Sequence, residues 1–352
     1  MKFSFNKIGQ KDVLLLYPLK LSSIKSSFYF DNKEINLKYI IIALIKYLRN
    51  FFLNHISFRN AYFNTIVEQV NPVLAIGHDQ DGRIKKFKKH FPKKISMMFQ
   101  YGAIHNVWKK YFNKFWGNQT VDFFIVFNKA SSLKLKSIKN LHCKYLYFGS
   151  LRNNEASIKI KKKKYDLMFI SDYRDIFGEG IYDLEIKNQK YNKLLLKVIA
   201  DYCIQRKKKI IVSLVSNRKE KKNWNFLKNL NFRIREKNYY QNISKIFQFN
   251  NLDSYESISE SRIAICSAST LGLELISRNE KVYFLDGYYN VRKNDYSINK
   301  KKIFKDLDKA FKTKKKALIK KTKKENLIIY DKNNSEFQKY LKKLIYERKK
   351  TF

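Results

Sequence analysis

Short apolar runs alternate with segments of helical periodicity along the first half of the chain. The apolar runs occupy 13–17, 73–77, 95–99 and 123–127. Apolar residues recur with helical spacing in 37–53, 60–70, 83–90 and 105–115. Strands separated by helices in this way are typical of a parallel sheet that helices cover on both faces.

The same alternation begins again in the second half. Strand-like runs lie at 167–170, 210–215, 263–266 and 282–285, and helical segments at 189–206, 253–260 and 269–278. The polar segment 155–164 separates the two series. A chain of 352 residues also exceeds the size at which one hydrophobic core usually keeps growing. We therefore predict an α/β protein with two Rossmann-like, doubly wound domains, residues 1–154 and 165–300.

Residues 301–352 form a lysine-rich tail with helical periodicity. Its last helix carries an apolar stripe, and Ser335 with Gln338 forms a candidate capping box. The stripe consists of Phe337, Tyr340, Leu341, Leu344 and Ile345. We favour a helix that packs back on the core across the cleft between the domains, with its lysines in water. Binding to an anionic membrane surface is the alternative.

The formal net charge of +44 raises the hypothesis of a nucleic-acid partner, because lysine and arginine neutralise phosphates. Of the 74 basic residues, 61 are lysine and 13 are arginine. The chain is also rich in Asn, Ile, Phe and Tyr, as expected from drift toward AT-rich codons. The lysines are spread along the whole chain, whereas a nucleic-acid footprint is concentrated on one face or tail. A solvated basic surface is favoured over a membrane or nucleic-acid footprint.

Neither metal ligation nor secretion is indicated by the sequence. The three cysteines and five histidines are dispersed, without the paired spacing of a zinc site or a disulfide framework. The longest apolar stretch, 37–53, contains Lys38, Lys46 and Arg49, so we interpret it as a buried amphipathic helix and not as a membrane span. We expect a cytoplasmic protein, with peripheral attachment to the cytosolic face of the inner membrane as an open alternative.

In doubly wound sheets, ligands bind beyond the carboxyl ends of the strands. The most informative turn of this kind follows the strand at 263–266 and leads directly into a helix. The hydroxyls of Ser267, Ser269 and Thr270, together with the helix N-terminus, form a candidate diphosphate site. Gly272 would let a ligand approach, and Glu274 would accept hydrogen bonds from a ribose. The alternative is that Ser269 is only a helix cap.

Arg174, after the strand at 167–170, is a second candidate for binding phosphate, since its planar guanidinium can grip phosphate with two hydrogen bonds. A structural ion pair with Asp172 is equally consistent with the sequence.

In the first domain, His78 and Asp79 lie at a strand end, with Asp81 just before a predicted helix. The Asp-x-Asp spacing admits a divalent-metal site or a helix cap. We prefer a third interpretation, in which Asp79 or His78 is a general base toward an acceptor hydroxyl and Asp81 is the cap.

Six short sequence segments occur in the same order as in proteins of O-antigen or surface-carbohydrate biosynthesis. They are the segments 73–81, 100–102, 127–128, 149–154, 170–174 and 269–274. The sequence resembles that family over residues 12 to 290. Two positions depart from the family pattern, Asp172 and Leu273.

The resemblance implies a GT-B-like glycosyltransferase fold, in which the second domain binds a nucleotide-activated donor and the first binds the acceptor. It places Gln100 and Gly102 beside Asp79 on the acceptor side. On the donor side it places Arg174, Ser269, Thr270 and Glu274.

From these observations we predict an enzyme that transfers a sugar or related group from a nucleotide sugar to a lipid-linked or growing surface glycan. No metal or other cofactor is required in this hypothesis, because cationic side chains and a helix N-terminus can stabilise the leaving diphosphate. The sequence lacks the glycine motifs of P-loop ATPases, nicotinamide enzymes and serine hydrolases. A sugar-nucleotide epimerase of the same fold and a basic nucleic-acid-binding protein remain as alternatives.

Overall fold

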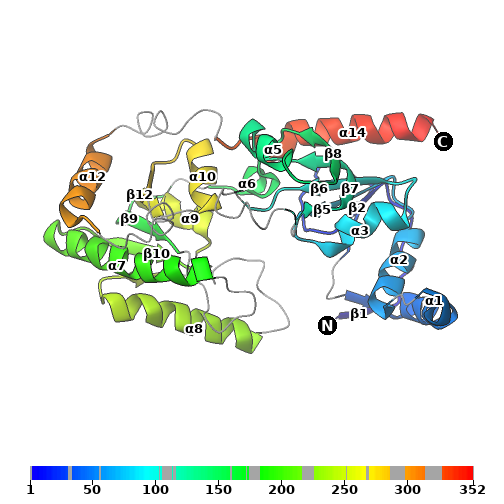
Figure 1. Ribbon diagram of the computed structural model, residues 1–352, viewed down its shortest axis with the longest axis horizontal. Coiled ribbons are helices and arrows are strands. Elements are labelled where there is room, and N and C mark those ends of the chain that lie inside the picture. The colour runs from blue at the N-terminus through cyan, green and yellow to red at the C-terminus, as the bar shows by residue number, and fades with distance from the viewer. Residues whose placement is uncertain are drawn as a thin grey trace. The chain divides into compact units, whose positions relative to one another are not determined.

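The structure, a computed structural model, separates into two compact units. One consists of Met1–Glu155 together with Ile329–Phe352, and the other of Ala156–Ile328 (Figure 1). The described residues are 2–30, 34–54, 57–102, 104, 113, 116–158, 161–171, 173, 183–215, 226–250, 252–266, 269–285, 298–313 and 327–351.

The first unit is built on a six-stranded parallel sheet with the order β3-β2-β5-β6-β7-β8. Its strands are β2 (Val13–Leu15), β3 (Ser27–Tyr29), β5 (Leu74–His78), β6 (Ile95–Phe99), β7 (Gln119–Ile125) and β8 (Leu141–Leu146). A small parallel sheet pairs β1 (Lys2–Ser4) with β4 (Glu34–Asn36). The helical elements are α1 (Leu37–Asn54), α2 (Phe58–Val70), α3 (Gly82–His90), α5 (Lys129–Leu135), α6 (Leu151–Glu155), η5 (Lys332–Asn334) and α14 (Ser335–Lys350).

Both faces of the six-stranded sheet are apolar and buried. Alternate residues of a strand point to opposite faces, so Ala75 of β5 joins a core with α2 and α3, while Leu74 and Ile76 join a core on the other face. Phe337 and Leu341 of α14 complete that second core and are fully buried. The stripe on α14 that could have bound a membrane is therefore a core contact, which confirms the predicted packing on the core; the predicted course across a cleft between the domains stays a prediction.

The C-terminal segment is held on the first unit by buried amides and by one close backbone contact. The Asn154 Nδ2 donates to Asn334 Oδ1 (2.9 Å), and Asn334 Nδ2 donates to the Leu151 carbonyl (3.0 Å). Gly149 has φ +73°, and a Cβ at this position would lie 1.9 Å from the Ile329 carbonyl oxygen. Only glycine fits this turn.

The predicted capping box at Ser335 and Gln338 is wrong. Asp331 supplies the capping carboxylate, since its Oδ2 accepts hydrogen bonds from Glu336 N (3.0 Å) and Phe337 N (3.2 Å). Ser335 instead donates from its hydroxyl to Asp331 Oδ1 (2.7 Å). The Gln338 side chain accepts from Ser23 N (2.8 Å) and thereby ties α14 to the loop after β2.

The second unit contains a five-stranded parallel sheet with the order β11-β10-β9-β12-β13. Its strands are β9 (Tyr165–Ile170), β10 (Ile210–Ser213), β11 (Gln248–Phe249), β12 (Ser261–Cys266) and β13 (Val282–Phe284). Its helices are α7 (Asp183–Gln205), α8 (Phe226–Ile243), α9 (Ser254–Ser259), α10 (Thr270–Ser277) and α12 (Lys300–Lys312). The core on one face includes residues of α7 and α12, and the core on the other face includes residues of α9 and α10.

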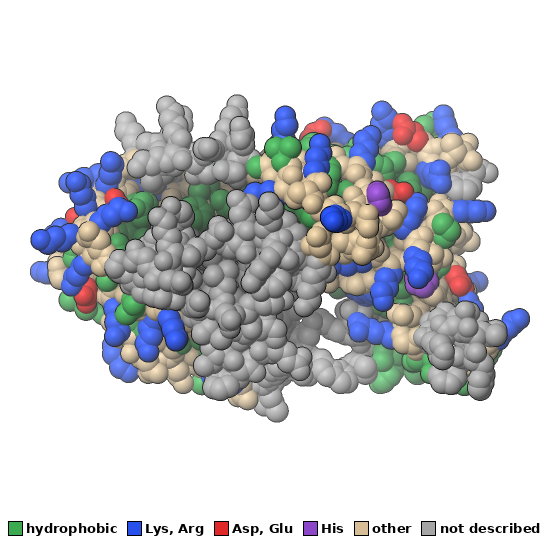
Figure 2. All heavy atoms as spheres, viewed as in Figure 1, with side chains coloured by type: hydrophobic (Ala, Val, Ile, Leu, Met, Phe, Trp, Pro, Cys, Tyr) green, Lys and Arg blue, Asp and Glu red, His purple; other side chains and the backbone are tan. Residues whose placement is uncertain are grey.

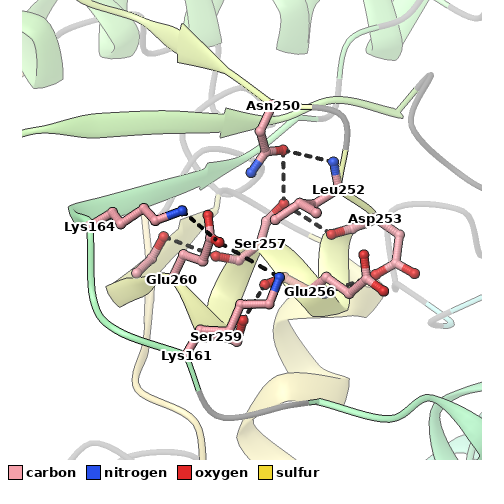
Figure 3. Close-up of polar contacts among 10 residues, drawn as sticks. Lys161, Lys164, Asn250, Leu252, Asp253, Glu256, Ser257, Ser259 and Glu260 are labelled. Atoms are coloured by element: carbon pink, nitrogen blue, oxygen red, sulfur yellow. Dashed lines mark hydrogen bonds and ion pairs between the residues drawn. The ribbon is translucent and has the colours of Figure 1, made fainter.

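The lysines of the polar segment 155–164 attach the start of the second unit to the end of α9. Glu260 is buried, and its Oε1 lies 3.2 Å from Lys164 Nζ and 3.7 Å from Lys161 Nζ (Figure 3). The backbone N–H of Lys164 also donates to the Glu260 carbonyl (2.8 Å). This part of the polar segment is thus fixed to the second unit, to which it belongs.

The architecture confirms two Rossmann-like, doubly wound α/β domains. The segment predicted as one tail, 301–352, is divided, because α12 packs in the second unit and 329–352 belong to the first. On the face shown in Figure 2, lysine and arginine side chains are scattered over both units.

Burial raises the pKa of Glu155 from 4.5 to about 7, against hydrogen bonds from Lys20 N and the Asn334 amide that favour the charged form. The folded state therefore binds a proton that the unfolded state releases, so this carboxyl makes stability fall as pH rises from about 4.5 to 7. Glu155→Gln keeps an acceptor oxygen without the charge. We expect it to be more stable than the parent by about 3 kcal/mol above pH 7 and equal to it below pH 4.5.

Urea unfolding at several pH values measures this difference. Asp79, whose pKa is also raised, titrates in both proteins and cancels in the comparison. If the free energy of unfolding depends on pH in the same way in parent and variant, burial of the charged Glu155 does not destabilise the protein.

Candidate functional site

Each of the two larger sheets has a topological switch point, where strands that follow one another in the chain lie on opposite sides of the first strand. In the first unit, β3 lies on one side of β2 and β5 on the other; in the second, β10 lies on one side of β9 and β12 on the other. Helices after neighbouring strands diverge at such a point, which opens a crevice beyond the strand ends. The predicted residue His78 ends β5, and the predicted residue Ser269 follows β12, so both lie at these edges.

Asp79 lies directly after β5 and is only 2% exposed. Its Oδ1 accepts a hydrogen bond from Tyr101 N (3.2 Å), and its Oδ2 accepts one from the Trp116 indole (3.3 Å). Burial raises the pKa of Asp79 from 3.8 to about 7, although these bonds and the charge of Lys85 lower it. At neutral pH, this carboxyl is therefore poised between its two protonation states.

His78 is half-buried among aromatic rings at the same edge. Its ring centroid lies 5.7 Å from that of Tyr17, beyond β2, and 5.1 Å from that of Tyr101, beyond β6. The Arg152 guanidinium lies 5.0 Å from the centre of the Tyr101 ring. These four side chains bring aromatic surface and a cation to the carboxyl edge of the first sheet.

The hydrogen bonding of His78 distinguishes it from Asp79 as a base. Its Nδ1 accepts from Gln80 N (3.2 Å), and an acceptor nitrogen carries no proton in the neutral ring. The proton of neutral His78 is thereby assigned to Nε2. This tautomer can donate a hydrogen bond through Nε2 but offers no lone pair there, which favours Asp79 as the base.

Asp81 is the N-cap of α3, as predicted. Its Oδ1 accepts from Arg83 N (2.9 Å), and its carboxylate also pairs with the Arg83 guanidinium (2.6 Å from Nη2 to Oδ2). Arg83 in turn donates to the Leu16 carbonyl (3.3 Å) and lies over the Phe30 ring. The two carboxylates of the Asp-x-Asp motif thus have separate partners, and Asp81 has a structural role.

Gln100 links the ends of two strands. Its Nε2 donates to the Gly102 carbonyl (2.8 Å), and its Oε1 accepts from Phe127 N (3.0 Å). The side chain is buried. Gln100 and Gly102 therefore shape the loop that carries Tyr101, next to Asp79.

In the second unit, Ser269 caps α10, with its hydroxyl accepting a hydrogen bond from Leu271 N (3.2 Å). Thr270 is the first residue of the helix and is half-buried. The positive end of the helix dipole thus points to the switch edge of the sheet. Two predicted phosphate ligands, Arg174 and Ser267, lie outside the described residues, as does Asp172.

Gly272 packs against the sheet. A Cβ there would lie 2.6 Å from Cys266 Sγ and 2.9 Å from Phe284 Cζ. The missing side chain lets α10 approach β12 and β13 closely. This packing is a structural reason for the glycine that the sequence did not reveal, and the predicted approach of a ligand at Gly272 stays a prediction.

Glu274 is fully buried, with no exposed surface. Its Oε2 accepts a hydrogen bond from the Tyr255 hydroxyl (2.7 Å), so the carboxylate connects α10 to α9. Contact with a ribose would require a ligand to reach this carboxylate behind the first turn of α10. The predicted ribose role of Glu274 stays a prediction.

A polar network that the sequence analysis missed lies beyond β9 and β10. Glu236 of α8 is fully buried, and its Oε1 accepts from the Ser171 hydroxyl and from Val215 N, both at 2.7 Å. The Tyr240 hydroxyl donates to Ser171 Oγ (2.8 Å). The only sequence signal was Ser171 at a strand end, since its partners lie 65 and 69 residues away.

Residues 99–345 match the model of a family described as "putative O-antigen biosynthesis protein". This match covers most of the chain. The chain belongs to this family. No curated protein sequence matches it.

Solved structures share the two-domain architecture of this O-antigen biosynthesis family member. A "putative UDP-N-acetylglucosamine 2-epimerase from Listeria monocytogenes" gives a TM-score of 0.52 at 10% identity, covering 97% of this chain and 98% of that one. S. aureus MnaA, in a structure with UDP, gives 0.52 at 11% identity, covering 95% and 97%. The wall teichoic acid polymerase TagF gives 0.50 at 12% identity, covering 99% and 89%. At these identities, the likeness establishes the GT-B-like fold alone.

Within the described ranges, no group of three or more His, Cys, Asp or Glu side chains is placed to hold a metal ion. In the same ranges, no helix is long and apolar enough to cross a bilayer.

The packing of Gly272 gives a direct test of its role. Gly272→Ala places a methyl group against Cys266 and Phe284, so we expect the apo protein to lose about 1–3 kcal/mol of unfolding free energy. Gly82→Ala is the matched control, because Gly82 begins α3 and a Cβ there has no neighbour within 4 Å. Denaturant unfolding measures both. An apo stability unchanged in Gly272→Ala, with only ligand binding weakened, would restore the ligand-approach interpretation.

Proposed function

We propose that this protein is a glycosyltransferase of bacterial surface-polysaccharide assembly, which transfers a sugar or related group from a nucleotide-activated donor. The family match supports the pathway, and the GT-B-like fold supports the nucleotide-sugar donor. The observation that carries the proposal is the start of α10 at the switch edge of the second sheet, with Thr270 in its first turn. Helix N-termini at such edges bind phosphate groups.

In the proposed donor site, the backbone N–H groups and positive dipole of α10 hold the donor diphosphate, with the Thr270 hydroxyl as a further donor of hydrogen bonds. Arg174 and Ser267 are proposed ligands from the neighbouring strand ends. Stabilisation of the leaving diphosphate by these groups needs no metal ion or other cofactor.

In the proposed acceptor site, the edge of the first sheet receives a lipid-linked or glycan hydroxyl beside Tyr17, His78 and Tyr101. Aromatic surface of this kind is common in ligand sites. Asp79 takes the proton of that hydroxyl while the hydroxyl oxygen bonds to the sugar and the bond from sugar to diphosphate breaks. To reach Asp79, the hydroxyl must replace one of its two present donors, and the Trp116 indole at 3.3 Å makes the longer bond.

A sugar-nucleotide epimerase is the second candidate, since two of the structures with this fold are, by their names or ligands, a UDP-N-acetylglucosamine 2-epimerase and a UDP-binding protein. Such an enzyme would convert the nucleotide sugar in the absence of any acceptor. Product analysis with and without a lipid or glycan acceptor distinguishes the two reactions. A nucleic-acid-binding protein would show neither, and its affinity for nucleic acid would fall steeply with salt.

UDP and UDP-sugars are the first ligands to test. A nucleotide that binds only the folded protein raises its melting temperature, by the equivalent of about 2.7 kcal/mol at a concentration 100 times Kd. Thr270→Val removes one hydroxyl at the proposed diphosphate site, and we expect it to weaken UDP binding about fivefold while the apo melting temperature changes little.

Ser277→Ala is the control for this variant, because its hydroxyl donates to the Glu274 carbonyl at the opposite end of α10. Calorimetric titration with UDP measures both variants. If Thr270→Val binds UDP as tightly as the parent, or if Thr270→Val and Ser277→Ala lose UDP affinity equally, the diphosphate does not bind at the N-terminus of α10.

Asp79 should control the pH dependence of turnover. Because its pKa is raised to about 7 and a base acts in its deprotonated form, kcat/KM should rise with pH through about 7 and then level off. Asp79→Asn should lower kcat by about 10²–10⁴-fold with UDP binding retained. His78→Gln should keep most activity and the same pH profile. A profile that shifts in His78→Gln and persists in Asp79→Asn would assign the base to His78.

A further inference from the structure

Helix α1 presents an apolar stripe to solvent in the first unit. Ile41, Leu44, Ile45 and Leu48 are 61%, 45%, 62% and 56% exposed. Their spacing of three and four residues places them on one side of the helix, over a length of about 10 Å. The sequence pattern predicts this helix correctly but as a buried one, and the structure corrects that prediction.

The opposite side of α1 anchors it to the unit. Tyr39 and Ala43 are buried, and the Tyr39 hydroxyl accepts a hydrogen bond from Ile8 N (2.9 Å). The helix packs against α2 and follows directly on β4, so it lies outside α2 and away from the six-stranded sheet (Figure 1). Its stripe is therefore not a surface of either proposed ligand edge.

Charge selects the partner of this stripe. Lys38 and Arg49 are exposed along one flank of it, and the sequence of α1 contains no aspartate or glutamate. A third cation, Lys46, faces α2 and pairs with Glu68. Apolar residues on one face with lysine and arginine beside them are the features of helices that lie in the plane of an anionic bilayer surface.

A second copy of the chain fits this surface less well. A two-fold interface would place the same patch against itself, with Lys38 and Arg49 of both copies around one contact and no carboxylate on the helix to pair them. An anionic lipid surface provides the missing counter-charges and an apolar layer for the stripe.

We propose that α1 is a membrane-docking helix, which inserts Ile41, Leu44, Ile45 and Leu48 into the interface of an anionic bilayer. This proposal goes beyond the transfer reaction and does not depend on it, because vesicle binding is measured without nucleotide or acceptor.

The test compares sedimentation with vesicles of phosphatidylglycerol and phosphatidylcholine in equal parts and with vesicles of phosphatidylcholine alone. The overall positive charge attracts any anionic vesicle, but that attraction is screened by salt. We expect the parent to bind the anionic vesicles and to remain partly bound at high salt. The variant Ile41→Gln, Ile45→Gln and Leu48→Gln, which keeps helix-forming residues, should lose about tenfold or more in affinity at high salt.

Two further variants complete the design. Leu194→Gln with Ile204→Gln on α7 removes exposed apolar side chains from the second unit and should bind as the parent does. Lys38→Gln with Arg49→Gln should lose about fivefold per residue at low salt and little at high salt. Circular dichroism verifies that each variant is folded.

The proposal is overturned if the stripe variant and the parent show the same salt-release curve, or if the parent leaves anionic vesicles completely at high salt. It is also overturned if the parent forms a dimer that the stripe variant does not form, while neither is retained by vesicles, since the partner would then be a second copy.

Discussion

The first unit depends on a contact between segments that are far apart in the chain. One face of its sheet is covered by α14, and the buried pair of Asn154 and Asn334, separated by 180 residues, holds that helix in place. An unpaired amide buried at this point would cost about 1–3 kcal/mol, so each asparagine requires the other. Nearby, Ile329 N donates to the Phe127 carbonyl (3.0 Å) and Gly149 lies against Ile329, at the start of the loop that leads into α6 and Arg152.

Local patterns allowed the sheets and the N-cap of α3 to be predicted from the sequence, because short-range physics determines them. Val13, Leu74 and Leu167 belong to short apolar runs that are typical of strands buried on both faces. Asp81 precedes a helix start and caps it without help from distant residues. The edge strand β8 was missed, because His142 and Lys144 interrupt its apolar residues and it lacks that apolar signature.

Predictions that depended on which distant residues pack against a side chain were less successful. The period of an amphipathic helix predicts a stripe but not its cover, which is why α14 had two interpretations and α1 was taken as buried. Gly272 was assigned to a ligand because the sequence does not reveal that Cys266 and Phe284 lie beneath it. Glu236 gave no signal at all, since a carboxylate in a helix is ordinary until the fold places Ser171 against it.

The return of the C-terminal segment also bears on how the protein is made. During synthesis from the N-terminus, residues 1–155 emerge long before α14, so the sheet face around Leu15, Ile76 and Met97 stays uncovered while the whole second unit is translated. Exposed apolar sheet surface in a nascent chain is prone to aggregation. The second unit, whose segments are contiguous, can fold first. The apolar face of the first sheet therefore stays open to aggregation until α14 has been made and can cover it.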